Sequence, residues 1–178
     1  MMTIFFEGHA LTSDNEAGVA SGHNDVELSE AGRIQAAGEK RQRYESIVID
    51  TVFTSDLRRA YETATIMFKG KAVPIIQDAR LRECNYGDLT QRPRPEMEAV
   101  RARSISDPFP NGESLGQVMD RMQSFINDLS QNHDDQDVLI IGHMGTLWGL
   151  EHHINGVSLP ALLSGKTAPT RKYTLCRK

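Results

Sequence analysis

The order of apolar and polar residues along the chain predicts four buried strands. Nearly continuous apolar runs occupy residues 3–6, 46–54, 72–77 and 137–141, and each run ends in a polar or glycine-rich turn. Strands that are apolar on both faces are typical of a parallel sheet with helices packed on both sides. Residues 171–178 alternate between apolar and polar positions instead, and we interpret them as an edge strand.

Helical patterns lie between these strands. The first begins at Ser29, whose hydroxyl is a typical N-cap. The second follows Ser55 and Asp56, either of which can cap it. In all three patterns apolar or small residues recur at the helical spacing. The patterns lie in residues 28–44, 55–68 and 112–132.

Strands that alternate with helices predict an α/β fold. We expect a three-layer α/β/α sandwich around a doubly wound, mostly parallel sheet with right-handed crossovers. The 178 residues suffice for one substantial core, so we expect a single domain over residues 1–178. In such folds the ligand binds outside the carboxyl ends of the strands.

Four side chains with useful chemistry lie at or near those strand ends: His9, Arg59, Glu83 and His143. Each has an ordinary structural interpretation when taken alone. A histidine at a strand end is more often a hydrogen-bonded structural residue, an arginine early in a helix is usually solvated, and a glutamate there can be a cap. The sheet rule, however, brings three separate strand-end loops around one crevice, which favours a shared site.

Composition narrows the choice of ligand. The net charge is −4, from 20 basic and 24 acidic residues spread along the chain, so we expect neither a nucleic acid nor a membrane as partner. No apolar run reaches the length of a membrane span, and no secretory signal is visible at the N-terminus. The two cysteines, Cys84 and Cys176, show no metal-ligand spacing and fit reduced thiols in a cytoplasmic protein.

The candidate side chains suit phosphoryl transfer. One imidazole can attack phosphorus, the second imidazole and the guanidinium can stabilise the equatorial oxygens, and a carboxylic acid can protonate the leaving oxygen. This chemistry requires neither a metal ion nor a cofactor, because cationic side chains and backbone N–H groups supply the positive charge.

The motifs of the chain resemble those of the histidine phosphatase superfamily, also called phosphoglycerate mutase-like, branch 1. Gly8-His9-Ala10-Leu11-Thr12, with Asn15 close behind, is similar to the first motif of that family, Arg-His-Gly-x-Thr. Further segments match the family in the same order. They are residues 20–36 (ASGHNDVELSEAGRIQA), 52–64 (VFTSDLRRAYETA), 81–89 (LRECNYGDL), 110–114 (PNGES) and 138–147 (VLIIGHMGTL).

The resemblance implies a phosphoglycerate mutase-like fold and a role for each matching residue. It implies that His9 is the nucleophile, that Arg59 and His143 bind phosphate, and that Glu83 donates a proton. It also implies polar support or substrate contacts from four further residues, Thr12, Asn15, His23 and Met144. For His23, a plain turn is an equally good explanation.

The first motif departs from the family pattern on both sides of His9. Gly8 stands where the family has arginine, and Ala10 stands where it has glycine. An arginine there would donate charge-assisted hydrogen bonds worth about 1.5–3 kcal/mol, so its loss predicts roughly ten- to a hundredfold weaker phosphate binding. Glu7 offers no replacement, and it would repel an anion if it faced the site. Shifting the alignment by one residue loses the nucleophile.

Another arginine can compensate for Gly8. Arg58 points about 100° away from Arg59 on a helix, and Arg82 is expected to face away from Glu83. The proline- and arginine-rich excursion at residues 85–113 can cover the site, but its arginines have no position from the sequence and are better explained as solvated surface charges. Those arginines are Arg92, Arg94, Arg101 and Arg103.

Two functions therefore remain. The first is a metal-independent phosphatase that acts on a small phosphomonoester or a phosphorylated protein side chain through a phosphohistidine at His9. The second, favoured by Gly8, is a weakened or inactive family member that binds a phosphorylated ligand or a protein partner. A mutase is less favoured because the excursion is short, and a nucleotide-dependent oxidoreductase is disfavoured because no Gly-x-Gly-x-x-Gly turn follows the first strand. The sequence does not indicate an oligomeric state.

Overall fold

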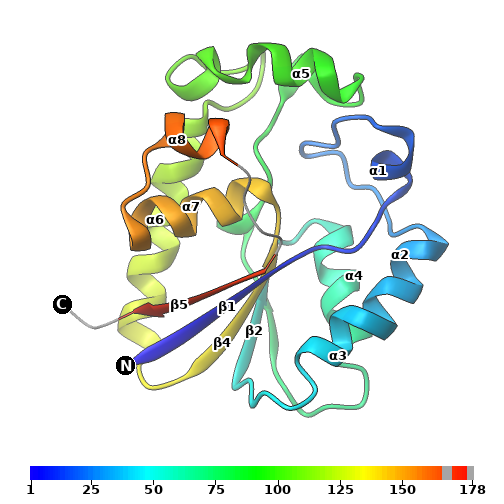
Figure 1. The fold of residues 1–178 in the computed structure, drawn as a ribbon, viewed down its shortest axis with the longest axis vertical. Coiled ribbons are helices and arrows are strands. Elements are labelled where there is room, and N and C mark those ends of the chain that lie inside the picture. Colours follow the sequence, from blue (N-terminus) through cyan, green and yellow to red (C-terminus); the bar gives the residue numbers. More distant parts are fainter. Residues whose placement is uncertain (166–169, 176–178) are drawn as a thin grey trace.

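The centre of the fold is a five-stranded sheet with the order β3-β2-β4-β1-β5. The structure is a computed structural model, and it describes residues 1–165 and 170–175. Four strands run parallel and β5 runs antiparallel to β1 at the edge, as Figure 1 shows, so the predicted mostly parallel sheet is confirmed. The strands are β1 (Met2–Gly8), β2 (Thr51–Thr54), β3 (Ile75–Gln77), β4 (Asp137–Gly142) and β5 (Thr170–Leu175).

Two strands are shorter than the apolar runs predict. β2 begins at Thr51 and not at residue 46, because its neighbour β4 begins at Asp137 and pairs Val138 with Thr51. Asp50 ends that ladder, since it exchanges hydrogen bonds with Asp137 in both directions. β3 begins at Ile75 and not at residue 72, and the preceding proline has no N–H to donate. The predicted edge strand is present as β5, and residues 176–178 of that prediction lie outside the described residues.

Helices cover both faces of the sheet. α6 and α7 pack on one face, and α2, α3 and α4 pack on the other (Figure 1). None of the helices in the described part of the chain has the length and apolarity that a membrane span needs. The α-helices are α1 (Ser13–Ala17), α2 (Glu30–Gln35), α3 (Arg41–Arg43), α4 (Arg58–Met67), α5 (Arg94–Arg101), α6 (Leu115–Asn132), α7 (Met144–Asn155) and α8 (Leu159–Ser164). The π turn is η1 (Ala36–Lys40), and the 3-10 turns are η2 (Ala79–Leu81), η3 (Gly87–Leu89) and η4 (Arg103–Ile105).

The strand residues alternate between two hydrophobic cores. Ile4 and Phe6 of β1 belong to the core beneath α6 and α7, whereas Phe5 belongs to the core beneath α2 and α4. Because side chains point to opposite faces in turn, a strand covered on both sides must be apolar throughout. This is why the apolar runs identify the strands.

The helix predicted over residues 28–44 is interrupted. Ser29 caps its start as expected, with its hydroxyl accepting from the Gly32 N–H at 3.1 Å. The π turn η1 then separates α2 from α3. The next predicted helix, α4, has Leu57 at its N-cap and not Ser55 or Asp56. Those two side chains bond elsewhere, to His143 and Arg82 respectively, and so leave the cap position to the next residue.

The excursion at residues 85–113 encloses a third apolar core. Phe109 and Met97 pack there with Trp148 from α7 and with Leu159 and Leu162 from α8. In Figure 1 this part of the chain, including α5, lies beyond the carboxyl ends of the strands. The excursion therefore packs over the carboxyl ends of the strands through its own apolar core.

A buried ion pair involves Glu7, close to the C-terminal end of β1. Glu7 is 0% exposed and accepts hydrogen bonds from Lys40 at 2.6 Å and Arg43 at 3.0 Å. The Lys40 ammonium, itself buried, also donates to the carbonyl of Gly8 at 2.9 Å. The charge of Glu7 is thus neutralised on the α3 side of the sheet, where it cannot repel an anion.

Replacing Lys40 by methionine is expected to destabilise the protein by about 3 kcal/mol, because Glu7 would stay buried with only the half-exposed Arg43 as a cationic partner. Denaturant unfolding measures this loss. Adding Glu7→Gln to Lys40→Met should recover part of it, and the exposed Lys69→Met is the matched control, expected within about 0.5 kcal/mol of wild type. A Lys40→Met variant as stable as Lys69→Met would show that the pair contributes nothing.

Candidate active site

Two histidines meet where β1 and β4 end. These neighbouring strands pair in register up to Gly8 opposite Gly142, and the next residues are His9 and His143. The His9 N–H continues the ladder by donating to the Gly142 carbonyl at 2.9 Å. The two imidazole rings lie with their centroids 5.1 Å apart and their planes tilted by 52°. Strand pairing alone therefore brings together two residues that are distant in sequence.

The half-buried His9 ring presents one nitrogen to the site. Its Nδ1 lies 2.7 Å from the Ala10 carbonyl oxygen, which can only accept, so Nδ1 bears the proton and Nε2 keeps its lone pair. Burial, followed by the charge of Arg59, lowers the pKa of His9 to about 3. The ring is thus held neutral, and its Nε2 forms no hydrogen bond with any residue that the structure describes.

His143 is deeper and has a partner that the sequence analysis did not propose as a site residue. It is 2% exposed, and its Nε2 lies 2.6 Å from the hydroxyl of Ser55 at the end of β2. Burial, then Arg59, then His9 hold its pKa well below the usual value. Its Nδ1 is buried and has no hydrogen-bond partner among the described residues.

Arg59 lies in the first turn of α4 and is almost completely buried. Its terminal nitrogens donate to the carbonyls of Gly22 at 2.8 Å and Asn24 at 2.9 Å, and Nε has no partner in the described part of the chain. Burial lowers the pKa of this guanidinium, and the Glu83 carboxylate acts in the opposite direction. Arg59 therefore both braces the loop at residues 22–24 and keeps donor capacity for a ligand.

The Glu83 carboxylate is held against the start of α7. It accepts from the N–H groups of Cys84 at 2.9 Å, Gly145 at 3.0 Å and Met144 at 3.2 Å. A Cβ at position 145 would lie 2.9 Å from a Glu83 oxygen, so glycine permits this close approach. The carboxyl group is fixed beside the two histidines.

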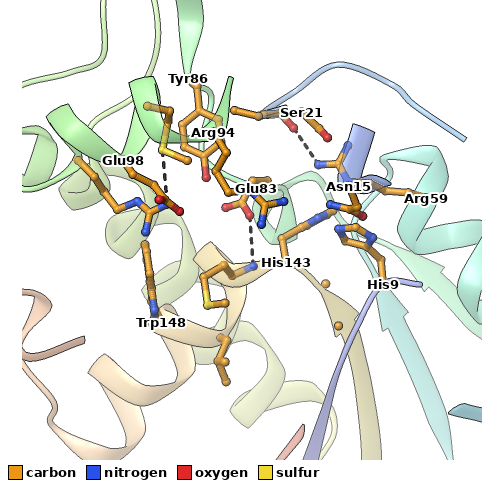
Figure 2. A pocket seen from close by; sticks show the side chains of 18 of the residues that line it. His9, Asn15, Ser21, Arg59, Glu83, Tyr86, Arg94, Glu98, His143 and Trp148 are labelled. Atoms are coloured by element: carbon orange, nitrogen blue, oxygen red, sulfur yellow. Dashed lines mark hydrogen bonds and ion pairs between the residues drawn. The ribbon is translucent and has the colours of Figure 1, made fainter. Parts of the chain in front are cut away.

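These side chains share a pocket of about 710 Å³. Figure 2 shows the two histidines, Arg59, Glu83 and Asn15 gathered in one part of it. The other walls come from α5, α7, α8, the loop after α1 and the segment before η3, and they combine apolar side chains with a few polar ones. They include Val19, Tyr86, Arg94, Met97, Glu98, Arg101, Leu147, Trp148, Leu162 and Leu163.

Most of the residues singled out in the sequence line this pocket, and two lie behind it. His9, Asn15, Arg59, Glu83, His143 and Met144 are lining residues. Thr12 is fully buried as the cap of α1, where it exchanges hydrogen bonds with Asn15. The His23 ring lies 2.8 Å from the Glu83 carbonyl oxygen and 3.6 Å from the Glu113 carboxylate. Both thus hold other site residues in place.

A model of the histidine phosphatase superfamily (branch 1) matches residues 4–176. The chain belongs to this superfamily. Among curated proteins, the chain is 31% identical over 167 residues to the 2,3-bisphosphoglycerate-dependent phosphoglycerate mutase of Cytophaga hutchinsonii, covering 84% of this chain and 76% of the mutase. It is 26% identical over 170 residues to phosphoserine phosphatase 1 of Hydrogenobacter thermophilus, covering 89% and 79% of the two chains.

A solved structure agrees with this assignment. Bacillus stearothermophilus YhfR superposes with a TM-score of 0.80 at 28% identity, covering 93% of this chain and 86% of YhfR. The phosphoglycerate mutase-like fold is therefore confirmed, and relatives of the chain are named both as phosphatases and as mutases.

Several residues that line the pocket were not assigned to a site from the sequence. Ser55 was considered only as a helix cap, although its place directly after β2 was an available signal. Arg94 and Arg101 were candidates without a position, and the structure places both on the pocket wall. Arg58 and Arg82 do not line it, since they pair with Glu27 and with Asp56.

The lowered pKa of His9 predicts the acid side of the activity profile. A histidine of ordinary pKa, about 6.5, would lose half of its neutral form at that pH, whereas a pKa of about 3 keeps His9 neutral far below it. We expect kcat/KM for an aryl phosphate to show no acid-side loss with a midpoint near pH 6.5. Initial rates between about pH 4.5 and 7.5 measure this, and a decline centred near pH 6.5 would contradict the neutral ring.

Proposed function

We propose that the protein hydrolyses a phosphomonoester through a phosphohistidine at His9. The observation that carries this proposal is the placement of His9, His143, Arg59 and Glu83 around one pocket, with His9 Nδ1 bonded to a carbonyl and Nε2 free. A neutral imidazole nitrogen with a free lone pair is a competent nucleophile toward phosphorus.

The reaction proceeds in two displacements. In the first, the lone pair of His9 Nε2 forms a bond to phosphorus while the bond from phosphorus to the ester oxygen breaks, and the protonated Glu83 gives that oxygen its proton. In the second, water attacks phosphorus, the ionised Glu83 takes a proton from the water, and the P–N bond breaks. The products are the alcohol and inorganic phosphate, and the neutral His9 is regenerated.

The surrounding groups stabilise the charge on the transferred phosphoryl oxygens. Arg59 is almost fully buried, and in that setting a fixed positive charge acts more strongly than it would in water. His143 is held by Ser55 and contributes a hydrogen bond from its ring. This arrangement needs no metal ion, because the donors of the chain itself neutralise the developing charge.

The size and lining of the pocket favour a small organic phosphoester. A volume of about 710 Å³ exceeds what a phosphate group needs and lies in the range of small-molecule sites. Apolar residues such as Leu162 and Trp148 share its walls with charged ones. The leaving group is therefore expected to have both an apolar part and polar groups. A phosphorylated protein side chain is the less favoured substrate.

The decisive experiment is hydrolysis of p-nitrophenyl phosphate in the presence of a chelator. His9→Ala is expected to reduce kcat by about 10³-fold or more, as removal of a nucleophile does in other covalent enzymes. His152→Gln is the matched control, because His152 lies near the C-terminal end of α7, bonds the carbonyl of Val157 beyond that end, and does not line the pocket. It should retain wild-type activity.

A rapidly quenched reaction should also show one phosphoryl group on the peptide that contains His9. Equal hydrolysis by the wild type and His9→Ala would contradict the proposal. The second candidate function, binding of a phosphorylated ligand without turnover, is favoured by Gly8 beside His9. It predicts that the wild type binds orthovanadate but does not hydrolyse the aryl phosphate.

A further inference from the structure

Gly8 leaves open space beside the proposed nucleophile. It lines the pocket, and a Cβ built on it would meet no heavy atom within 4 Å. Its backbone does not adopt a left-handed conformation, so other residues can occupy this position without strain. Neither space nor backbone geometry therefore requires the glycine, and position 8 itself presents no side-chain donor to the pocket.

Arg94 enters the same pocket from the opposite wall. It is the first residue of α5, it lines the pocket, and Figure 2 shows its side chain extending from α5 into the space near Glu83. Burial and Arg59 are the main causes that lower the pKa of His9, and Arg94 adds a smaller contribution in the same direction. The positive charge of Arg94 is therefore within electrostatic reach of the nucleophile.

The backbone of Arg94 is fixed to the loop that follows the nucleophile. Its N–H donates to the Gly18 carbonyl at 2.9 Å, and Pro93 forms a β-bridge with Val19. Arg94 also lies between two prolines, which restrict the backbone on both sides. The start of α5 and the loop after α1 are thus joined, and Arg94 keeps its place relative to His9.

Arg94 is also the pocket arginine with an uncommitted side chain. Arg59 donates to two carbonyls, and Arg101 stacks over Trp148 at 5.5 Å and contacts Met97 and Glu98. Within the described ranges, by contrast, the Arg94 guanidinium has no hydrogen bond or ion pair. Its five N–H donors are free for a ligand.

We propose that Arg94 binds the phosphoryl group at His9 and supplies the charge-assisted hydrogen bonds that an arginine at position 8 would otherwise supply. This inference rests on the proposed function, since it assumes that phosphate binds at His9. It assigns Arg94 to the transferred group and not to a second anionic group on the remainder of the substrate.

A double-mutant cycle between Arg94→Ala and Gly8→Arg tests the assignment. In the wild-type background Arg94→Ala should reduce kcat/KM for p-nitrophenyl phosphate by about ten- to a hundredfold, the effect of losing a charge-assisted hydrogen bond. In the Gly8→Arg background the same change should cost less than about threefold, because the guanidinium introduced at position 8 serves the same oxygens.

Arg92→Ala is the matched control. Arg92 lies two residues away, pairs with Glu96 on the surface and does not line the pocket, so its loss removes the same charge from the excursion without touching the site. It should retain full activity. Thermal unfolding of each variant verifies folding, and Gly8→Arg is expected to unfold at the wild-type temperature since its Cβ meets no atom.

Two results would overturn the inference. If Arg94→Ala loses no more activity than Arg92→Ala, Arg94 does not bind the phosphoryl group. An equal loss in both backgrounds would place Arg94 on another part of the substrate, because the two guanidinium groups would then not serve the same oxygens.

The same cycle measured by calorimetric titration with orthovanadate separates this inference from the proposed function. The wild type can fail to hydrolyse the aryl phosphate and still bind vanadate in a way that depends on Arg94, with that dependence lost in the Gly8→Arg background. This result would contradict the hydrolysis and support the role of Arg94. A wild type that binds no vanadate would overturn both.

Discussion

The site depends on the register between two neighbouring parallel strands. Gly8 of β1 lies opposite Gly142 of β4, and the residue after each is a histidine, so the ladder that holds the sheet together also sets the distance between the two imidazoles. A slip of one residue would turn every side chain of β1 to the opposite face of the sheet. Ile4 and Phe6 would then point into the core beneath α2 and α4 and not into the core beneath α6 and α7. The burial of the strand therefore specifies the geometry of the chemistry at its end.

Charged side chains lie on two sides of the C-terminal end of β1, one behind the sheet and one facing the pocket. Lys40 and Arg43 neutralise Glu7 behind the sheet, and the Lys40 ammonium also holds the Gly8 carbonyl. Arg59 and Arg94 lie on the pocket side. Both sets act on His9 in the same direction, since Arg59, Lys40 and Arg94 each add to the effect of burial in lowering its pKa. The neutral state of the His9 ring is thus a property of its surroundings as much as of the residue.

The sequence predicted the residues that follow strands and missed those positioned by long-range contacts. His9, Arg59 and His143 could be placed together because apolar runs mark the strand ends and the sheet rule brings those ends to one edge. Arg94 could not be placed, because the excursion has no periodic pattern and its position depends on hydrogen bonds to Gly18 and Ala20. The sequence also left open whether Glu7 faces the site, and only the contacts of its carboxylate with Lys40 and Arg43 show where it lies.

The most direct measurement of the central claim is a crystal structure of the protein with bound orthovanadate. The account predicts vanadium bonded to Nε2 of His9, with Arg59, Arg94 and His143 around the equatorial oxygens and Glu83 beside the apical oxygen opposite the histidine. Vanadate bound elsewhere in the pocket, or bonded to His143 with His9 turned away, would contradict it.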